Sequence, residues 1–330
     1  MWRLSSAFTV TSLIPSQIYA RRFGDCKDKA SLMIALLRSA CIEAEIALVR
    51  TRSLGDVVGE PASIAIFNHA IVYVPRYDLW LDGTAEYAGR ELPIEDQGAV
   101  ALTVNLAGAA QFRHVPMSKA ADNYTKHTIR ASVSAQGAIQ FSGSTVTRGE
   151  DAPGLRHDLA VPERRLDTFR RELAEVFPSV QVDRVAVRGA EELSSAVSVD
   201  FQGALNSFEQ KRVVSLSSSW MPRSYVAALA ATSTRTQDLV LPSPWTTEEE
   251  IHIALPAGAD VGALPRDQFI AGNFGSVRLH YKKSGNEVVV VSHVEFEKAR
   301  VSAQDYPAFR QFCSQVERSF RNDITVSLPQ

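Results

Sequence analysis

A cysteine between charged residues, directly before an apolar helix-forming run, is the first feature of the chain that could do chemistry. Cys26 lies in the segment GDCKDKA. A thiol in the first turn of a helix faces unpaired N–H groups and the positive end of the helix dipole, and both favour the nucleophilic thiolate. Lys27 and Lys29 add positive charge, but Asp25 and Asp28 offset it. Catalysis at Cys26 therefore needs a histidine partner.

His69 and Asp82 are the best candidates for that partner and for the carboxylate that orients it. Residues 69–82 predict a β-hairpin. If Val74 pairs with Tyr77 across the turn, His69 lies directly opposite Asp82, with the two Cβ atoms about 4.5–5.5 Å apart. A carboxylate at that distance can hold one imidazole tautomer. A slip of one residue would put Asp82 on the other face of the hairpin.

The elements around these residues predict an α+β first part. Helical spacing of Leu32, Met33, Leu36 and Leu37 predicts a helix over 26–40, with Asp25 as its cap. Cys41 follows that helix where a glycine cap is expected, so we interpret it as structural. Residues 46–49 predict a buried strand, and a loop rich in Gly, Pro and Ser follows over 53–63.

Beyond about residue 105 the pattern changes to short strands. Two helices interrupt them, at 163–177 and 305–320, and Cys313 falls on the apolar stripe of the second helix. A hairpin turn is predicted at 283–286. The strands are expected at 128–133, 139–146, 180–187, 197–201, 213–220, 251–255, 277–281 and 288–296. The resulting division is a domain over 1–105, a linker over 106–127 and a β-rich, sandwich-like domain over 128–330.

Composition excludes several classes of function. The chain has 330 residues and a formal net charge of −2, so neither part has the basic surface that nucleic acid requires. No apolar run reaches the roughly 18–20 residues that span a bilayer, and the start is not typical of a signal peptide. Three widely spaced cysteines indicate neither a zinc site nor a disulfide framework. We predict no metal and no cofactor, and oligomeric state is left open.

Three boxes in the order GDCKDKA, FNHAIVYV and LWLDGTA, within residues 21–87, resemble the Cys, His and Asp boxes of bacterial transglutaminase-like proteins. These belong to the papain-like superfamily. The resemblance implies a core in which a nucleophile helix packs on an antiparallel sheet. It implies Cys26 as nucleophile, His69 as general base and acid, and Asp82 as the orienting carboxylate. The substrate would be a peptide or protein amide.

Residues 241–265 and 305–320 are similar to the β-rich C-terminal region of large bacterial proteins that carry this domain. In those proteins another β-rich domain precedes the catalytic one, so the resemblance implies an N-terminally truncated chain. Family members are commonly exported or associated with the cell envelope. The sequence itself assigns no compartment.

Related enzymes place an oxyanion-hole side chain, often Gln or Trp, ahead of the nucleophile. The backbone N–H of Cys26 can supply one donor, and Gln17 and Trp2 are the candidates for a second. Loss of a second donor costs roughly 10²–10³ in rate, so we expect an assembled triad with slow or absent amide turnover. Three further residues are expected as neighbours rather than reagents: Gly24, Asn68 and Trp80.

Two functions of different classes remain open. The chain is either a thiol enzyme that transfers an acyl group from an amide to water or an amine, or a binding and assembly module that keeps the scaffold. An intact N-terminal donor favours the enzyme, and its absence favours the module. Taken singly, Cys26 is more typical of a structural cysteine, His69 of a strand histidine, and Asp82 with Gly83 of a turn.

Overall fold

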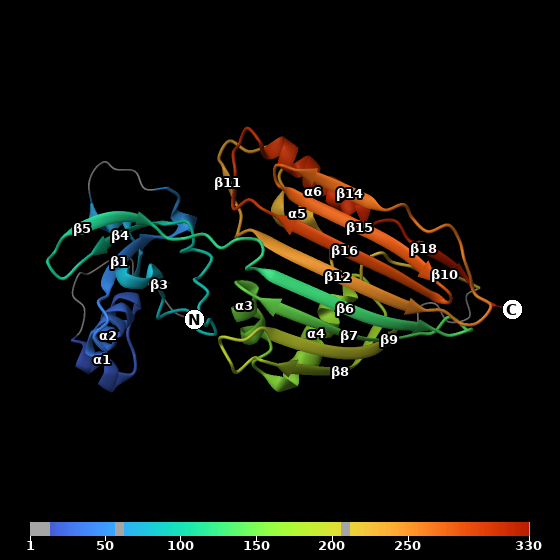
Figure 1. Ribbon diagram of the computed structural model, residues 1–330, viewed down its shortest axis with the longest axis horizontal. Helices are drawn as coiled ribbons and strands as arrows, with labels where there is room; N and C mark the ends of the chain where they lie inside the picture. The colour runs from blue at the N-terminus through green and yellow to red at the C-terminus, as the bar shows by residue number, and fades with distance from the viewer. Residues whose placement is uncertain (1–13, 57–62, 206–211, 330) are drawn as a thin grey trace. The chain divides into compact units, whose positions relative to one another are not determined.

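A computed structural model describes residues 14–56, 63–205 and 212–329 (Figure 1). The chain divides into two compact units, residues 1–117 and residues 118–330. Both units are mixed α+β, and the described residues contain six α-helices. None of those helices has the length and apolar character needed to cross a bilayer.

Unit 1 is built on a five-stranded antiparallel sheet with the order β3-β2-β1-β4-β5. β2 covers the predicted residues, and β4 and β5 were not predicted. The strands are β1 (Glu45–Arg50), β2 (His69–Val74), β3 (Leu79–Leu81), β4 (Val100–Val104) and β5 (Ala110–His114). Short 3₁₀ turns occupy Arg52–Leu54, Ile64–Ile66 and Pro75–Tyr77.

The predicted first helix forms as α2 (Cys26–Ser39), and a short unpredicted helix, α1 (Pro15–Arg21), precedes it. A capping box closes the start of α2. The Asp25 carboxylate accepts the Asp28 N–H at 3.1 Å, and the Asp28 carboxylate accepts the Asp25 N–H at 3.3 Å. Past its end, Cys41 is exposed and adopts a φ of 59°, the left-handed conformation that usually calls for glycine.

α2 packs on one face of the sheet through part of the expected stripe and two further residues. Ala30 and Ile34 are buried against Ala70 and Val72, and Met33 and Leu37 of the expected stripe pack against the same cluster. Leu36, by contrast, is 55% exposed. A second cluster of buried side chains covers the opposite face, comprising Ala47, Val49, Ile71, Tyr73, Trp80, Ala99, Ala101 and Val115.

The hairpin between β2 and β3 has a different register from the predicted one. Val74 pairs with Leu79 instead of Tyr77, because residues 75–78 form a 3₁₀ turn that ends with Asp78 at a φ of 46°. The register therefore differs by two residues. Since the side-chain period of a strand is two, the difference leaves Asp82 on the same face as His69, as its diagonal rather than its direct neighbour.

The segment 106–127, expected as a linker, carries secondary structure. β5 lies inside it and pairs with β4, and the first strand of unit 2 begins at Tyr124. β5 has no buried side chain, so it lacks the alternating pattern by which a strand is recognised in a sequence.

Unit 2 is built on an eight-stranded sheet with the order β14-β15-β16-β12-β6-β7-β9-β8 (Figure 1). Neighbouring strands are antiparallel except β6 and β12, which are parallel. The predicted turn at 283–286 joins β15 and β16, with Ser284 paired to Glu287. The strands are β6 (Tyr124–Val133), β7 (Ile139–Arg148), β8 (Val180–Arg188), β9 (Val197–Leu205), β12 (Trp245–Ala254), β14 (Gln268–Gly272), β15 (Gly275–Ser284) and β16 (Glu287–Phe296).

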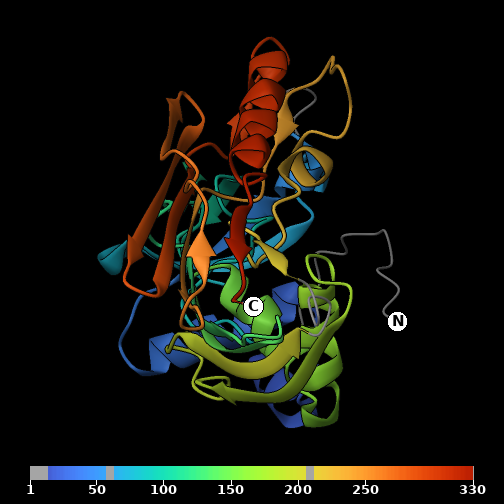
Figure 2. The ribbon, with the colours of Figure 1, turned by 90° about the vertical axis from the view of Figure 1, so that its right-hand side faces the viewer.

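Helices and a three-stranded sheet, β10-β18-β13, share one hydrophobic core with the large sheet. Figure 2 shows α6 and β18 beside the strands of the large sheet. α6 buries Phe309, Phe312, Cys313 and Val316, and Phe320, directly after the helix, is buried as well. The remaining strands are β10 (Val213–Leu216), β11 (Leu239–Val240), β13 (Asp260–Val261), β17 (Arg300–Val301) and β18 (Ile324–Ser327).

The described part of unit 2 holds four α-helices where two were predicted. The predicted pair are α4 (Arg165–Ala174), which follows a 3₁₀ turn at Pro162–Arg164, and α6 (Tyr306–Ser319). The additional helices are α3 (Asp151–Asp158) and α5 (Tyr225–Leu229). With 8 and 5 residues, they are too short for a helical period to stand out in the sequence.

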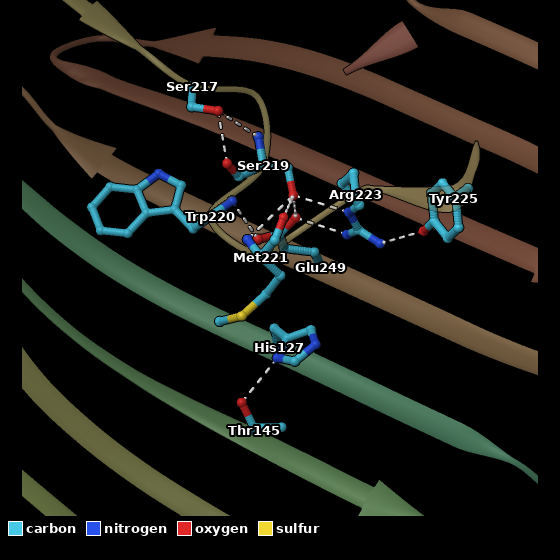
Figure 3. A network of polar contacts seen from close by, with 9 residues as sticks. All are labelled: His127, Thr145, Ser217, Ser219, Trp220, Met221, Arg223, Tyr225 and Glu249. Carbon is cyan, nitrogen blue, oxygen red and sulfur yellow. Dashed lines mark hydrogen bonds and ion pairs between the residues drawn. The ribbon is translucent and has the colours of Figure 1, made fainter. Parts of the chain in front are cut away.

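A buried polar network fastens residues 217–223 to the centre of the large sheet (Figure 3). The Glu249 carboxylate on β12 accepts hydrogen bonds from the Ser219 hydroxyl at 2.6 Å, the Trp220 N–H at 2.7 Å and the Arg223 guanidinium at 2.9 Å. Nearby, His127 is hydrogen-bonded to Thr145, and burial lowers the pKa of His127 to about 4, so this imidazole is neutral. The strand predicted over 213–220 ends at Leu216 because the chain turns into this network.

Replacing Glu249 is expected to destabilise unit 2. Glu249→Gln removes the charge that partners Arg223, a side chain only 8% exposed, and an unpaired buried charge costs about 3–5 kcal/mol. The neighbouring Glu250→Gln is the control, because Glu250 is 35% exposed and its ion pairs are worth about 1 kcal/mol or less. Urea unfolding of both variants measures the difference. Equal midpoints for the two variants would contradict the structural role of the network.

Candidate active site

The structure brings Cys26, His69 and Asp82 together at one end of the unit 1 sheet. Cys26 is the first residue of α2, His69 is the first residue of β2, and Asp82 directly follows β3. His69 Nε2 lies 3.0 Å from Asp82 Oδ2. Cys26 is close enough to the His69 side chain to raise the pKa of the imidazole. The imidazole thus has both the thiol and the carboxylate as neighbours.

The meeting of Cys26 and His69 depends on where the helix and the strand begin. Strand alternation places His69 on the face of Ile71, whereas α2 packs on the face of Ala70. Each residue is the first of its element, so they meet at the end of the two layers rather than through the sheet. β3 stops at Leu81, which leaves the adjoining edge of β2 uncovered.

The chain after Asp82 then passes close to α2. A Cβ on Gly83 would lie 3.3 Å from Lys29 Cβ and 3.2 Å from the Met33 terminal methyl group. These contacts are tighter than most side chains tolerate, so the glycine permits the close approach. The approach holds Asp82 beside the first turns of the nucleophile helix.

Asp82 is held in its charged form. Its side chain is 1% exposed, and burial alone would raise the pKa of the carboxyl. The hydrogen bond and charge of His69, together with hydrogen bonds from Thr84, outweigh burial and lower the pKa below its ordinary value. The Thr84 N–H and hydroxyl donate to Asp82 Oδ1 at 2.7 and 2.8 Å. Asp82 can therefore orient His69 as a fixed anion.

A second carboxylate, Asp96, belongs to the cluster and was not predicted. Asp96 Oδ2 lies 3.8 Å from His69 Nε2, and the Asp96 side chain is 1% exposed. A turn holds it in place, with the Asp96 N–H donating to the Pro93 carbonyl at 3.0 Å. In the sequence, Glu95-Asp96-Gln97-Gly98 has the composition of a solvated loop, so only the fold reveals its proximity to His69.

The charges around His69 fix its proton. Burial lowers the pKa of the imidazole, but hydrogen bonds to Asp82 and Cys26, and the charges of Asp96 and Asp82, raise it to about 10. His69 is therefore an imidazolium at neutral pH.

Imidazole and carboxylate are also ligand types for divalent cations. Donor atoms of His69, Asp82 and Asp96 lie within 4.8 Å of one another. His69 Nε2 is hydrogen-bonded to Asp82, and we derive no step from a metal at this cluster.

The three residues expected as neighbours of the site, Gly24, Asn68 and Trp80, have structural roles. A Cβ on Gly24 would lie 2.6 Å from Asp28 Cβ, so Gly24 lets the chain enter the capping box. Asn68 exchanges hydrogen bonds with Thr51, and Trp80 packs on Tyr73 with ring centroids 4.6 Å apart.

Of the two candidate oxyanion donors, Trp2 lies outside the described residues. Gln17 is exposed on α1. Within the described part of the chain, no hydrogen bond joins its side chain to the cluster.

An apolar cleft of about 520 Å³ begins beside the cluster and runs between α1 and α2. Lys29 and Met33, which follow Cys26 on the same side of α2, contribute to it. The cleft is lined by Ile18, Tyr19, Phe23, Leu32, Met33 and Leu36, with Arg22, Lys29, Gly24 and Gly83 at its border. Tyr19 and Phe23 in this lining are 69% and 63% exposed.

Comparison with known proteins bears mainly on the fold. A family model described as a domain of unknown function with solved structure, DUF3858, matches residues 211–326, within unit 2. The chain is similar to a crystal structure from Parabacteroides distasonis ATCC 8503 described as a "putative protease". The TM-score is 0.51 at 14% identity, over 95% of this chain and 46% of that one.

At this identity the similarity shows a shared fold, and the chain spans about half the length of that structure. No curated protein matches the sequence.

The raised pKa of His69 predicts a pH-dependent contribution to stability. A histidine with a raised pKa stabilises the folded state fully below its unfolded value of 6.5, and this contribution is lost as pH rises through about 10. The stability difference between the native protein and His69→Gln should shrink by on the order of 3 kcal/mol between pH 7 and pH 10.5. Urea unfolding across that range measures it. A difference that stays constant with pH would show that His69 is not held as an imidazolium.

Proposed function

We propose that unit 1 is a transglutaminase-like domain of the papain-like type that transfers an acyl group from an amide through Cys26. One observation carries the proposal: His69, with Nε2 3.0 Å from the buried Asp82 carboxylate, also has Cys26, at the capped start of α2, as a neighbour close enough to raise its pKa. Thiol, imidazole and carboxylate in that order are the arrangement that activates a cysteine nucleophile.

In the proposed reaction Cys26 acts as a thiolate beside the His69 imidazolium. The thiolate attacks the carbonyl carbon of the amide, and the carbonyl oxygen becomes an oxyanion. The carbon–nitrogen bond then breaks, and His69 donates its proton to the departing amine, leaving a thioester on Cys26. Water or a second amine, deprotonated by the now neutral His69, attacks the thioester and restores the thiolate.

The oxyanion has one donor that follows from the fold. Cys26 is the first residue of α2, and the N–H groups of a first helical turn have no intrahelical acceptor. Gln17, the second candidate, is exposed on α1. A single donor supports slow turnover, since one missing donor costs roughly 10²–10³ in rate.

The cleft between α1 and α2 supports a substrate with an apolar or aromatic side chain next to the scissile amide. It begins at Gly24 and Gly83, which neighbour the nucleophile and the orienting carboxylate in the chain. Arg22 and Lys29 at its border favour an acidic group beside that side chain. The similar fold of a structure described as a protease is compatible with a peptide substrate.

The alternative is a binding or assembly module that keeps this scaffold. The position of Gln17 on the exposed side of α1 favours it, because a module needs no oxyanion hole. The two functions differ in covalent turnover and not in fold.

Selective alkylation tests whether Cys26 is an activated nucleophile. We expect iodoacetamide at pH 7 to modify Cys26 at least about tenfold faster than Cys41, although Cys41 is the more exposed thiol. Peptide mass spectrometry over time gives both rates in one sample. His69→Gln should remove the advantage of Cys26. Faster modification of Cys41 would show that Cys26 is an ordinary structural cysteine.

Turnover assays test whether Cys26 transfers an acyl group from an amide. Hydrolysis of fluorescent casein and incorporation of dansylcadaverine into dimethylcasein measure transfer to water and to an amine. We expect Cys26→Ala to abolish both while its urea midpoint stays near the native value, and Cys41→Ser, the matched control, to leave both unchanged. Absence of turnover together with fast Cys26 alkylation would favour the module. Activity that survives Cys26→Ala would exclude the proposed nucleophile.

A further inference from the structure

We propose that Asp96 is a positioning residue that shares a proton with Asp82 and, on losing it, locks the proton of His69 in place. Asp96 would then set the pH range in which His69 can act as a base on the acyl-enzyme. This inference rests on the proposed function of Cys26 and His69, but it concerns a different residue and has its own measurement.

The geometry of Asp96 is unusual for a buried carboxylate. Its side chain is 1% exposed, and its Oδ2 atom has no hydrogen-bond partner among the described residues. The nearest cation is His69 Nε2 at 3.8 Å, which is too far for a hydrogen bond but close enough for a strong charge interaction. A buried anion with an unpaired oxygen is costly, whereas a neutral carboxyl group can donate a hydrogen bond instead.

Asp82 is the acceptor for that donated hydrogen bond. Oxygen atoms of Asp96 and Asp82 lie within 4.8 Å of each other, and the interaction with Asp82 raises the pKa of Asp96. Two carboxylates that share a site cannot both ionise easily, so one of them retains a proton. Thr84 and His69 hold Asp82 in the charged form, and the proton therefore belongs to Asp96.

The groups that face Asp96 come from three parts of unit 1. His69 on β2 lowers the pKa of Asp96, whereas burial, which is the largest effect, raises it. Asp82 after β3 and the adjacent Glu95 raise it further, and the result is about 7. The Glu95 carboxylate also accepts the Ser53 N–H at 2.9 Å. From α2, Cys26 acts on this cluster through His69, whose pKa it raises.

The two states of Asp96 have different effects on His69. Below pH 7 neutral Asp96 donates to Asp82, and one net negative charge faces one imidazolium. Above pH 7 the second carboxylate ionises, and two negative charges hold the same proton more tightly. After His69 has given its proton to the leaving amine, two charged carboxylates favour its reprotonation from solvent, and a protonated His69 cannot deprotonate the water or amine that resolves the thioester. Resolution of the acyl-enzyme should therefore slow as pH rises through about 7.

The test follows the His69 ring by NMR in ¹⁵N-histidine-labelled protein from pH 5 to pH 11, with a chelator present. The His69 signals are those absent from His69→Gln. In the native protein we expect an inflection near pH 7 from Asp96 and loss of the ring proton near pH 10. In Asp96→Asn the inflection should disappear, and the ring proton should be lost about one pH unit lower or more.

Glu95→Gln is the matched control, because Glu95 is the exposed neighbouring carboxylate. It should keep the inflection and move loss of the ring proton by less than about 0.3 pH. A purely structural role for Asp96 would leave the native His69 signals without an inflection near pH 7, which overturns the inference. An inflection that persists in Asp96→Asn also overturns it.

If Asp96→Asn does not fold, the native titration alone decides. The presence of the inflection near pH 7 supports the inference, and its absence overturns it. Because the measurement needs no substrate, a protein without amide turnover can still carry the inflection. Failure of the proposed function and failure of this inference are thus distinguishable.

Discussion

A half-buried imidazole between two buried carboxylates is the constraint on which unit 1 depends. Asp82 and Asp96 are each 1% exposed, and two unpaired charges at such positions would cost several kcal/mol each. The positive charge of His69 and the hydrogen bonds of Thr84 offset one of those charges, and a retained proton removes the other. The loop after β3, the turn before β4 and the start of β2 must all hold their positions for this balance to exist.

The same constraint explains the irregular features nearby. β3 ends after three residues, so Asp82 can leave the sheet and approach His69. Gly83 and Gly24 have no side chain where one would meet Lys29 or Asp28 on α2. The capping box then orients the first turn, which carries the thiol. Local features that weaken a regular sheet or helix therefore serve the contact between Cys26 and His69.

Much of this could be predicted from local sequence, and the rest depends on contacts that sequence does not encode locally. The start of α2 and the bounds of β2 follow from a capping signal and an apolar run. The hairpin register was wrong by two residues because a 3₁₀ turn replaced the expected tight turn. Asp82 stayed beside His69 only because an even shift preserves the face. Asp96 lies 27 positions beyond His69 in a polar turn, and no periodicity marks it.

Two acidic residues, Asp96 in unit 1 and Glu249 in unit 2, show why burial alone does not identify a functional group. Both side chains are 1% exposed. Glu249 accepts hydrogen bonds from a hydroxyl, a backbone N–H and a guanidinium, so its charge is fully compensated and its role is to hold a loop on the sheet. Asp96 has an oxygen without a donor and a histidine just beyond hydrogen-bonding distance. A compensated charge has no reason to exchange its proton near neutral pH, whereas an uncompensated one beside an imidazolium does.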